Sequence, residues 1–166
     1  MLLIFILIFY DIRPTGYVIK IPMRGGKYTV FLVDDSVDDR LFMRMALERS
    51  SKLVLIREAS DGQEALDYLR GNDLFNDRQL YPLPDILLLD LKMPKKNGFD
   101  VLKELKELHF KTMVAAIISG SNLKEDVTKS LALGADAYFT KTAERIEQEA
   151  MVKSIEALVE KKQSSP

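Results

Sequence analysis

Polar residues stand at the carboxyl ends of four apolar runs: Asp34 and Asp35 after the first, and Asp90, Ser119 and Lys141 after the later ones. The runs themselves are typical of strands that are buried on both faces. A carboxylate at the end of a buried strand is costly unless it has a partner or a task. Because sites in open α/β sheets lie at the carboxyl ends of the strands, we expect these five side chains to meet in one crevice.

The residue types in this set suit phosphoryl transfer. Several carboxylates in one place repel one another, and a hard divalent cation such as Mg²⁺ would relieve that repulsion. Lys141 offers a point charge for phosphate, and Ser119 offers a hydroxyl donor. An aspartate can itself accept a phosphoryl group covalently. Since phosphoryl transfer needs mainly positioning and charge neutralisation, the set predicts formation and hydrolysis of an aspartyl phosphate on Asp90.

The elements that must position these residues alternate regularly from Lys27 onward. Apolar runs predict strands at 28–33, 53–59, 86–90, 112–118 and 137–140. Helical periodicity predicts helices at 36–49, 61–70, 98–108, from about 123 to Gly134, and at about 143–162. Five strands alternating with five helices predict an α/β fold, with a parallel sheet, right-handed crossovers and helices on both faces.

The same periodicity predicts which helix residues face the core. In the first and fourth helices we expect the inward stripes to be Val37, Leu41 and Met45, and Leu123, Val127 and Leu131. Residues 71–84 hold few periodic apolar positions and predict a long loop, which is long enough to suggest a role in binding a partner.

Composition limits the class of protein. The chain has 166 residues, which suffices for one well-buried domain, and its net charge of −1 predicts no general attraction to nucleic acid or to a membrane surface. There is no cysteine, so disulfides, thiol catalysis and cysteine-ligated metals are excluded. The single histidine, His109, is expected at a helix end on the surface, and a cytoplasmic location is expected.

From about residue 27 to residue 162 the chain resembles a receiver domain of two-component response regulators, of the standalone, single-domain type. The family's acidic pair after the first strand matches Asp34 and Asp35, and its phosphoacceptor motif matches the segment from Asp90 through Pro94 to Gly98. The family's hydroxyl residue, switch aromatic, lysine and Gly-Ala pair match, in turn, Ser119, Tyr138, Lys141 and Gly134-Ala135.

This resemblance implies a flavodoxin-like, doubly wound sheet with strand order 2-1-3-4-5. It also implies that Asp34, Asp35, Asp90 and the backbone carbonyl of Lys92 hold Mg²⁺. A histidine kinase or a phosphotransfer protein would supply the phosphoryl group to Asp90. The chain is then a phosphoacceptor signalling protein and not a metabolic enzyme, with only self-catalysed phosphotransfer and autodephosphorylation.

By the same resemblance, phosphorylation draws Ser119 toward the phosphoryl group and turns Tyr138 inward. This would remodel the surface formed by the last two helices and the last strand, which is also the surface through which a homodimer could form. Output would pass through contacts with a downstream protein whose identity the sequence does not give. No contact with nucleic acid or a membrane is expected.

One residue departs from the family pattern. The position after the family's lysine is usually proline and here is Thr142, so the geometry of the Lys141 loop is open. That departure leaves a degenerate receiver, which binds partners without being phosphorylated, as one alternative. A phosphohydrolase with an aspartate nucleophile is another, although such enzymes often place an acidic residue where Lys92 stands.

The first 26 residues precede the regular pattern, and residues 27–163 form the expected receiver domain, with no output domain expected after it. Residues 1–10 are almost all apolar but too short to span a bilayer. They are interpreted as a dispensable extension, with Met23 as an alternative start; a tail that binds a membrane or a partner is the other hypothesis. A short extra strand is predicted at residues 17–21.

Overall fold

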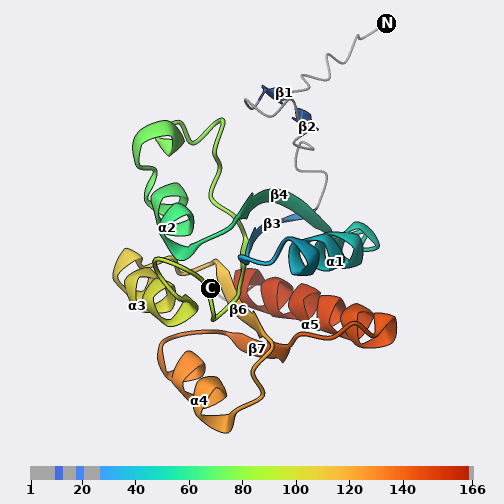
Figure 1. Cartoon of the computed structure of the whole chain (residues 1–166). Helices are drawn as coiled ribbons and strands as arrows, with labels where there is room; N and C mark the ends of the chain where they lie inside the picture. The colour runs from blue at the N-terminus through green and yellow to red at the C-terminus, as the bar shows by residue number, and fades with distance from the viewer. Residues whose placement is uncertain (1–9, 13–17, 21–26, 165–166) are drawn as a thin grey trace, which may run out of the picture.

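The central sheet of the computed structural model has five parallel strands in the order β4-β3-β5-β6-β7 (Figure 1). The structure describes residues 10–12, 18–20 and 27–164. The strands of this sheet are β3 (Tyr28–Val33), β4 (Leu53–Ala59), β5 (Ile86–Leu89), β6 (Val114–Ser119) and β7 (Ala137–Thr140). Counted along the chain within this sheet, their spatial order is 2-1-3-4-5, which confirms the predicted flavodoxin-like fold.

Helices cover both faces of the sheet, as predicted. They are α1 (Val37–Glu48), α2 (Gly62–Arg70), α3 (Gly98–Leu108), α4 (Lys124–Ala132) and α5 (Arg145–Ser164). On one face α1 packs beside α5, and on the other α2 packs beside α3 (Figure 1). Helix α4 contacts α3 and the edge strand β7.

Strand β3 shows why the sheet has two cores. Val30 and Leu32 join the apolar cluster under α1 and α5, whereas Phe31 and Val33 join the cluster under α2 and α3. All four side chains are buried. Since successive residues of a strand point to opposite faces, a strand between two helix layers must be apolar at every position.

The predicted inward stripe of α1 is wrong. Val37, Leu41 and Met45 are 69%, 44% and 46% exposed. The residues that α1 buries are Met43, Ala46 and Leu47. The helix sequence carries apolar side chains on two opposite sides, and only the side with Ala46 packs against the sheet and α5.

The predicted stripe of α4 is wrong at its ends as well. Leu123 and Leu131 are 62% and 48% exposed, and the only residue that α4 buries is Ser130. Because α4 lies against β7, the last strand of the sheet, it has little apolar surface to cover. Periodicity gave the helix correctly but not its orientation.

A separate two-stranded sheet, β1 and β2, precedes the central sheet along the chain. Strand β2 (Val18–Lys20) lies within the predicted strand at 17–21 and pairs antiparallel with β1 (Tyr10–Ile12), which was not predicted. The other residues of the predicted N-terminal extension, and with them the predicted role of the apolar start, lie outside the described residues. Among the helices that the structure describes, none combines the length and apolar character needed to cross a membrane.

The predicted loop at 71–84 contains one 3-10 turn, η1 (Asp73–Phe75). Several hydrogen bonds fasten it to α2. The hydroxyl of Tyr68 donates to the carbonyl of Pro82 at 2.6 Å, and Arg78 Nη1 donates to the carbonyl of Tyr68 at 2.9 Å. These hydrogen bonds therefore hold the loop against α2 at the surface of the protein.

Candidate functional site

The sheet ladder itself places three of the predicted site residues. Beyond the last residues of the strands, Asp34 N donates to Ala59 O at 3.1 Å and Asp90 N donates to Val33 O at 2.8 Å. Lys141 N donates to Ser119 O at 2.8 Å. Because these bonds continue the strand pairing by one residue, the three side chains start from one edge of the sheet.

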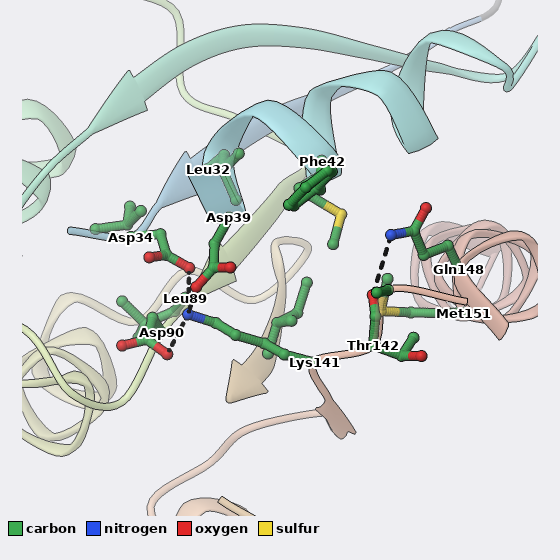
Figure 2. A pocket seen from close by; sticks show the side chains of 14 residues that line it. Leu32, Asp34, Asp39, Phe42, Leu89, Asp90, Lys141, Thr142, Gln148 and Met151 are labelled. Carbon is green, nitrogen blue, oxygen red and sulfur yellow. Dashed lines mark hydrogen bonds and ion pairs between the residues drawn. The ribbon is translucent and has the colours of Figure 1, made fainter. Parts of the chain in front are cut away.

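Lys141 is the centre of the cluster (Figure 2). Its Nζ atom lies 2.7 Å from Asp34 Oδ2, 2.8 Å from Asp39 Oδ2 and 3.1 Å from Asp90 Oδ1. Burial alone would lower the pKa of Lys141, but the hydrogen bonds to Asp34 and Asp39 and the charge of Asp90 outweigh it and raise the pKa above its ordinary value. Lys141 is therefore a cation that binds three carboxylates at once.

Asp34 and Asp90 are buried, with side chains only 5% and 4% exposed. Burial raises the pKa of Asp34 above its ordinary value of 3.8, against the opposing effects of Lys141 and of the Ser36 N–H that Asp34 accepts. The neighbouring charge of Asp90 also raises it. Burial therefore disfavours the ionised form of Asp34, and positive charge beside its carboxylate favours that form.

A metal ion could supply that charge. Asp34, Asp35 and Asp90 each offer a carboxylate oxygen, and these three atoms lie within 4.8 Å of one another. Two of the residues are buried and Asp35 is exposed, so the group opens to solvent. A small set of carboxylate oxygens with room for water fits Mg²⁺ and similar hard cations.

The loop after β5 curls back on Asp90. Asp90 Oδ2 accepts a hydrogen bond from the backbone N–H of Lys92 at 2.7 Å. Within this loop the side chains of Leu91 and Met93 are buried, and Gly98 N donates to Leu91 O at 3.0 Å. Lys92 is therefore adjacent to the Asp90 carboxylate, and the predicted use of the Lys92 carbonyl as a metal ligand stays a prediction.

A second ion pair fixes the same loop. Lys95, whose φ angle is 61°, places its ammonium 2.6 Å from Asp61 Oδ2. Asp61 is also the N-cap of α2, where it accepts from Glu64 N at 2.9 Å. Neither Asp61 nor Lys95 was predicted as a site residue, since their pairing joins positions that are distant along the chain.

Within the described part of the chain, the predicted switch residues, Ser119 and Tyr138, form hydrogen bonds with backbone groups of Ser121 and not with charged side chains. Ser119 is fully buried, and its hydroxyl oxygen accepts from Ser121 N at 3.2 Å. The Tyr138 hydroxyl donates to the carbonyl of Ser121 at 2.8 Å, and Tyr138 is half-buried against the core under α2 and α3. Ser121 thus links Ser119 to Tyr138, while their movement on phosphorylation stays a prediction.

Thr142, which stands where the family usually has proline, holds the Lys141 loop by hydrogen bonds. Its hydroxyl donates to Glu147 Oε2 at 2.6 Å and accepts from Glu144 N at 3.1 Å. Its carbonyl accepts from the buried Gln148 side chain at 3.0 Å, as the dashed line in Figure 2 marks. These bonds tie the residue after Lys141 to the start of α5.

A cleft of about 190 Å³ opens beside the charged cluster. Its polar lining includes Asp34, Asp39, Asp90 and Lys141, and Phe42 stands at its edge on the α1 side (Figure 2). Asp39 is a lining residue that was not among the predicted site residues. The available signal was its place in the first turn of the helix that directly follows Asp34 and Asp35, and the sequence alone did not show that this turn faces Lys141.

A family model, solved structures and curated relatives of the response regulator type match this chain. The family model described as "Response regulator receiver domain" matches residues 30–156. The crystal structure of the phosphorylated cyanobacterial phytochrome response regulator RcpA is similar with a TM-score of 0.66 and 34% identity, covering 78% of this chain and 91% of that one. Response regulator Rcp1 of Synechocystis sp. is 30% identical over 132 residues, which cover 77% of this chain and 86% of Rcp1.

Longer proteins match over part of their length. The nitrate/nitrite response regulator protein NarL of Escherichia coli is 31% identical over 116 residues, which cover 70% of this chain and 49% of NarL. The chain thus spans about half the length of this relative. A solved Mn²⁺-bound form of Rcp1 is also similar, with a TM-score of 0.64 and 30% identity over 78% of this chain and 92% of that one.

Proposed function

We propose that this chain is a phosphoacceptor signalling protein that accepts a phosphoryl group on Asp90. The premise is that the chain belongs to the response regulator receiver domain family. The donor is a histidine kinase or a phosphotransfer protein. The phosphorylated form then signals by changing its contacts with a downstream protein.

The observation that carries this proposal is the bridge formed by Lys141. A single ammonium contacts Asp90, the proposed acceptor, and Asp34, a proposed metal ligand, at the edge of a cleft. This arrangement gathers an acceptor, a cation and a cation-binding group within hydrogen-bonding reach. A degenerate receiver, which is not phosphorylated, does not require this arrangement. A phosphohydrolase with an aspartate nucleophile often has an acidic residue at the position where this chain has Lys92.

In the reaction, a carboxylate oxygen of Asp90 forms a bond to phosphorus, and the bond from phosphorus to the donor's imidazole nitrogen breaks. The leaving imidazole nitrogen keeps the electron pair of that bond. Asp34, Asp35 and Asp90 would hold Mg²⁺, which would supply neutralisation of charge on the phosphoryl oxygens, and the Mn²⁺-bound form of Rcp1 supports a divalent site of this kind. Lys141 moves its ammonium from the carboxylates to a phosphoryl oxygen.

We propose that the hydroxyl of Ser119 donates to the phosphoryl group and that Tyr138 follows through Ser121. The chain Ser119–Ser121–Tyr138 supports this, because a change at Ser119 Oγ is one hydrogen bond away from the loop that Tyr138 holds. The surface of α4, β7 and α5 would then carry the output and, in a homodimer, the contact between copies. The solvent-exposed Leu131 on α4 gives that surface an apolar position. Action in the cytoplasm, without contact with nucleic acid or membrane, belongs to the same proposal.

The test is phosphorylation by acetyl phosphate with and without Mg²⁺, followed by intact mass and peptide mapping. We expect one Mg²⁺-dependent phosphoryl group on the peptide that contains Asp90. Asp90→Asn should remove it, and Asp38→Asn, which changes an exposed carboxylate in the first turn of α1, should not. A protein that binds Mg²⁺ but neither gains a phosphoryl group from acetyl phosphate nor binds beryllofluoride would contradict the proposal.

A further inference from the structure

Asp39 is the third carboxylate on Lys141, and neither the resemblance nor the acidic group that could hold a metal accounts for it. The bound metal would use Asp34 and Asp90, two of the three partners of Lys141. Asp39 is not in that group, so its contact with Lys141, at 2.8 Å, can persist beside the metal. We infer that Asp39 is a positioning residue that sets where Lys141 rests, so that it strengthens Mg²⁺ binding and weakens binding of the phosphoryl group.

The local structure of α1 fixes this carboxylate in place. Asp39 N donates to the hydroxyl of Ser36, the N-cap of α1, at 3.2 Å. The next residue, Arg40, donates to the carbonyl of Asp34 through its guanidinium. The first turn of α1 is thereby bound to the end of β3, and in Figure 2 Asp39 points from α1 toward the ammonium of Lys141.

The effect on Mg²⁺ follows from charge. A divalent cation held by Asp34 and Asp90 would repel the ammonium of Lys141 and would replace it as the partner of these two carboxylates. Asp39 gives that ammonium a counter-charge outside the metal group. Without Asp39, Lys141 would lean more heavily on the same two carboxylates, and Mg²⁺ would have to compete for them.

The effect on the phosphoryl group has the opposite sign. A phosphoryl group on Asp90 needs Lys141 as a partner, and Asp39 competes for that ammonium. The negative charge of Asp39 also repels the phosphoryl oxygens. Because the Asp39 side chain is 39% exposed, solvent screens both effects, which limits each to a few-fold change.

The experiment compares Asp39→Asn with Asp38→Asn, a neighbouring change of equal charge at an exposed residue of the same helix turn. Calorimetric titration measures the Kd of Mg²⁺, and then the Kd of beryllofluoride at saturating Mg²⁺. For Asp39→Asn we expect the Kd of Mg²⁺ to rise about two- to fivefold and the Kd of beryllofluoride to fall by a similar factor. Asp38→Asn should change both by clearly less.

Opposite shifts separate positioning from a merely structural role, which would weaken both ligands together. A loss of both affinities in Asp39→Asn, or shifts equal to those of Asp38→Asn, would overturn the inference. The inference rests on the proposed function, but the two can fail separately. If the wild-type protein binds Mg²⁺ and not beryllofluoride, the proposed function fails, and the Mg²⁺ shift alone decides the role of Asp39.

Discussion

Two neighbouring loops leave the same edge of the sheet, one after β5 and one after β6, and they are built differently. The loop after β5, residues 91–97, packs closely on its inner side, where Leu91 and Met93 are buried, while Lys92, Pro94 and Lys95 are exposed. Its backbone runs so close to α2 and α3 that a side chain at Gly62 or Gly98 would place a Cβ 2.3 Å from Lys96 O or 2.4 Å from Asp90 O. Asn97 then begins α3 with a complete capping box.

The loop after β6, residues 120–123, has room around it. A Cβ on Gly120 would meet nothing within 4 Å. Helix α4 begins after Leu123, which is exposed and provides no side-chain cap. The loop is held chiefly by Ser121, through its bonds to Ser119 and Tyr138 and through the contact of its hydroxyl with Asp126 at 2.5 Å.

The difference fits the two tasks in the proposed function. An acceptor carboxylate must stay fixed relative to the metal ligands, because catalysis by positioning is lost with small displacements. A residue that responds to the phosphoryl group must instead be able to move at low cost. A tight loop beside Asp90 and an open loop beside Ser119 supply these properties within neighbouring strands.

The largest expected effect comes from adding one methyl group at Gly98, where the first loop meets α3, and one at Gly120 in the second loop. Gly98→Ala should destabilise the protein by about 3 kcal/mol, because the new Cβ meets backbone atoms that cannot rotate away. It should also weaken Mg²⁺ binding by displacing Asp90. Gly120→Ala, the matched control, should be neutral or stabilising by about 0.4–1 kcal/mol, since no atom opposes the methyl group and the unfolded chain loses freedom.

Urea unfolding gives the two free energies, and calorimetry gives the two Mg²⁺ affinities. The contrast between the loops is wrong if Gly98→Ala costs no more than Gly120→Ala. The contrast is strengthened if Gly120→Ala leaves the affinity for Mg²⁺ unchanged but alters the movement of Tyr138 that beryllofluoride is expected to cause.

A second contrast concerns charge, since Asp34 carries an ionisable group and Ser119 does not. The folded-state pKa of Asp34 is raised above 3.8, chiefly by burial, so its contribution to stability is full below pH 3.8 and is lost as the pH rises through the raised value. At pH 7 without Mg²⁺, Asp34→Asn should therefore raise the Tm by a few degrees. The gain should shrink as the pH falls toward 3.8.

Thermal melts across pH in EDTA, repeated with Mg²⁺, test this expectation. Mg²⁺ should reverse the order, because only the wild-type carboxylate would be able to ligate the ion. Ser119→Ala is the control and should show no such dependence on pH. An Asp34→Asn variant that melts below the wild type at pH 7 in EDTA would mean that the ion pair with Lys141 outweighs burial.

The sequence predicted the strands well because burial on both faces demands uninterrupted apolar runs, as in Val30 to Val33. It also predicted the residues that follow the strands, and the structure brings Asp34, Asp90 and Lys141 together. These positions depend on strand ends, which a linear pattern marks clearly. The strand order, by contrast, came from the resemblance to a family and not from the pattern itself.

What the sequence did not predict depends on contacts between distant segments. Val37 and Met43 are both apolar residues of α1, and only packing against the sheet and α5 decides that Met43 is the buried one. Asp39 faces Lys141 for the same reason, since the rotation of α1 about its axis decides it. The predicted roles of Ser119 and Tyr138 rest on a change of state and remain to be tested.

The smallest expected effects concern the helix caps that follow the two loops. Asn97→Ala should cost about 1 kcal/mol, because it removes the side chain that accepts from Asp100 N at 3.1 Å. Leu123→Ser should instead stabilise by up to about 1 kcal/mol, because Leu123 already has the extended backbone of an N-cap (φ −66°, ψ 129°) and lacks only the acceptor. Urea unfolding measures both changes, and hydrogen exchange in α4 localises the second.

The same cap also tests the proposed switch. If Leu123→Ser slows the movement of Tyr138 that beryllofluoride is expected to cause, without changing the affinity for Mg²⁺, the uncapped start of α4 contributes to the switch. Equal costs from both substitutions would instead show that α4 is already as firmly held as α3, which would remove the structural contrast between the two loops.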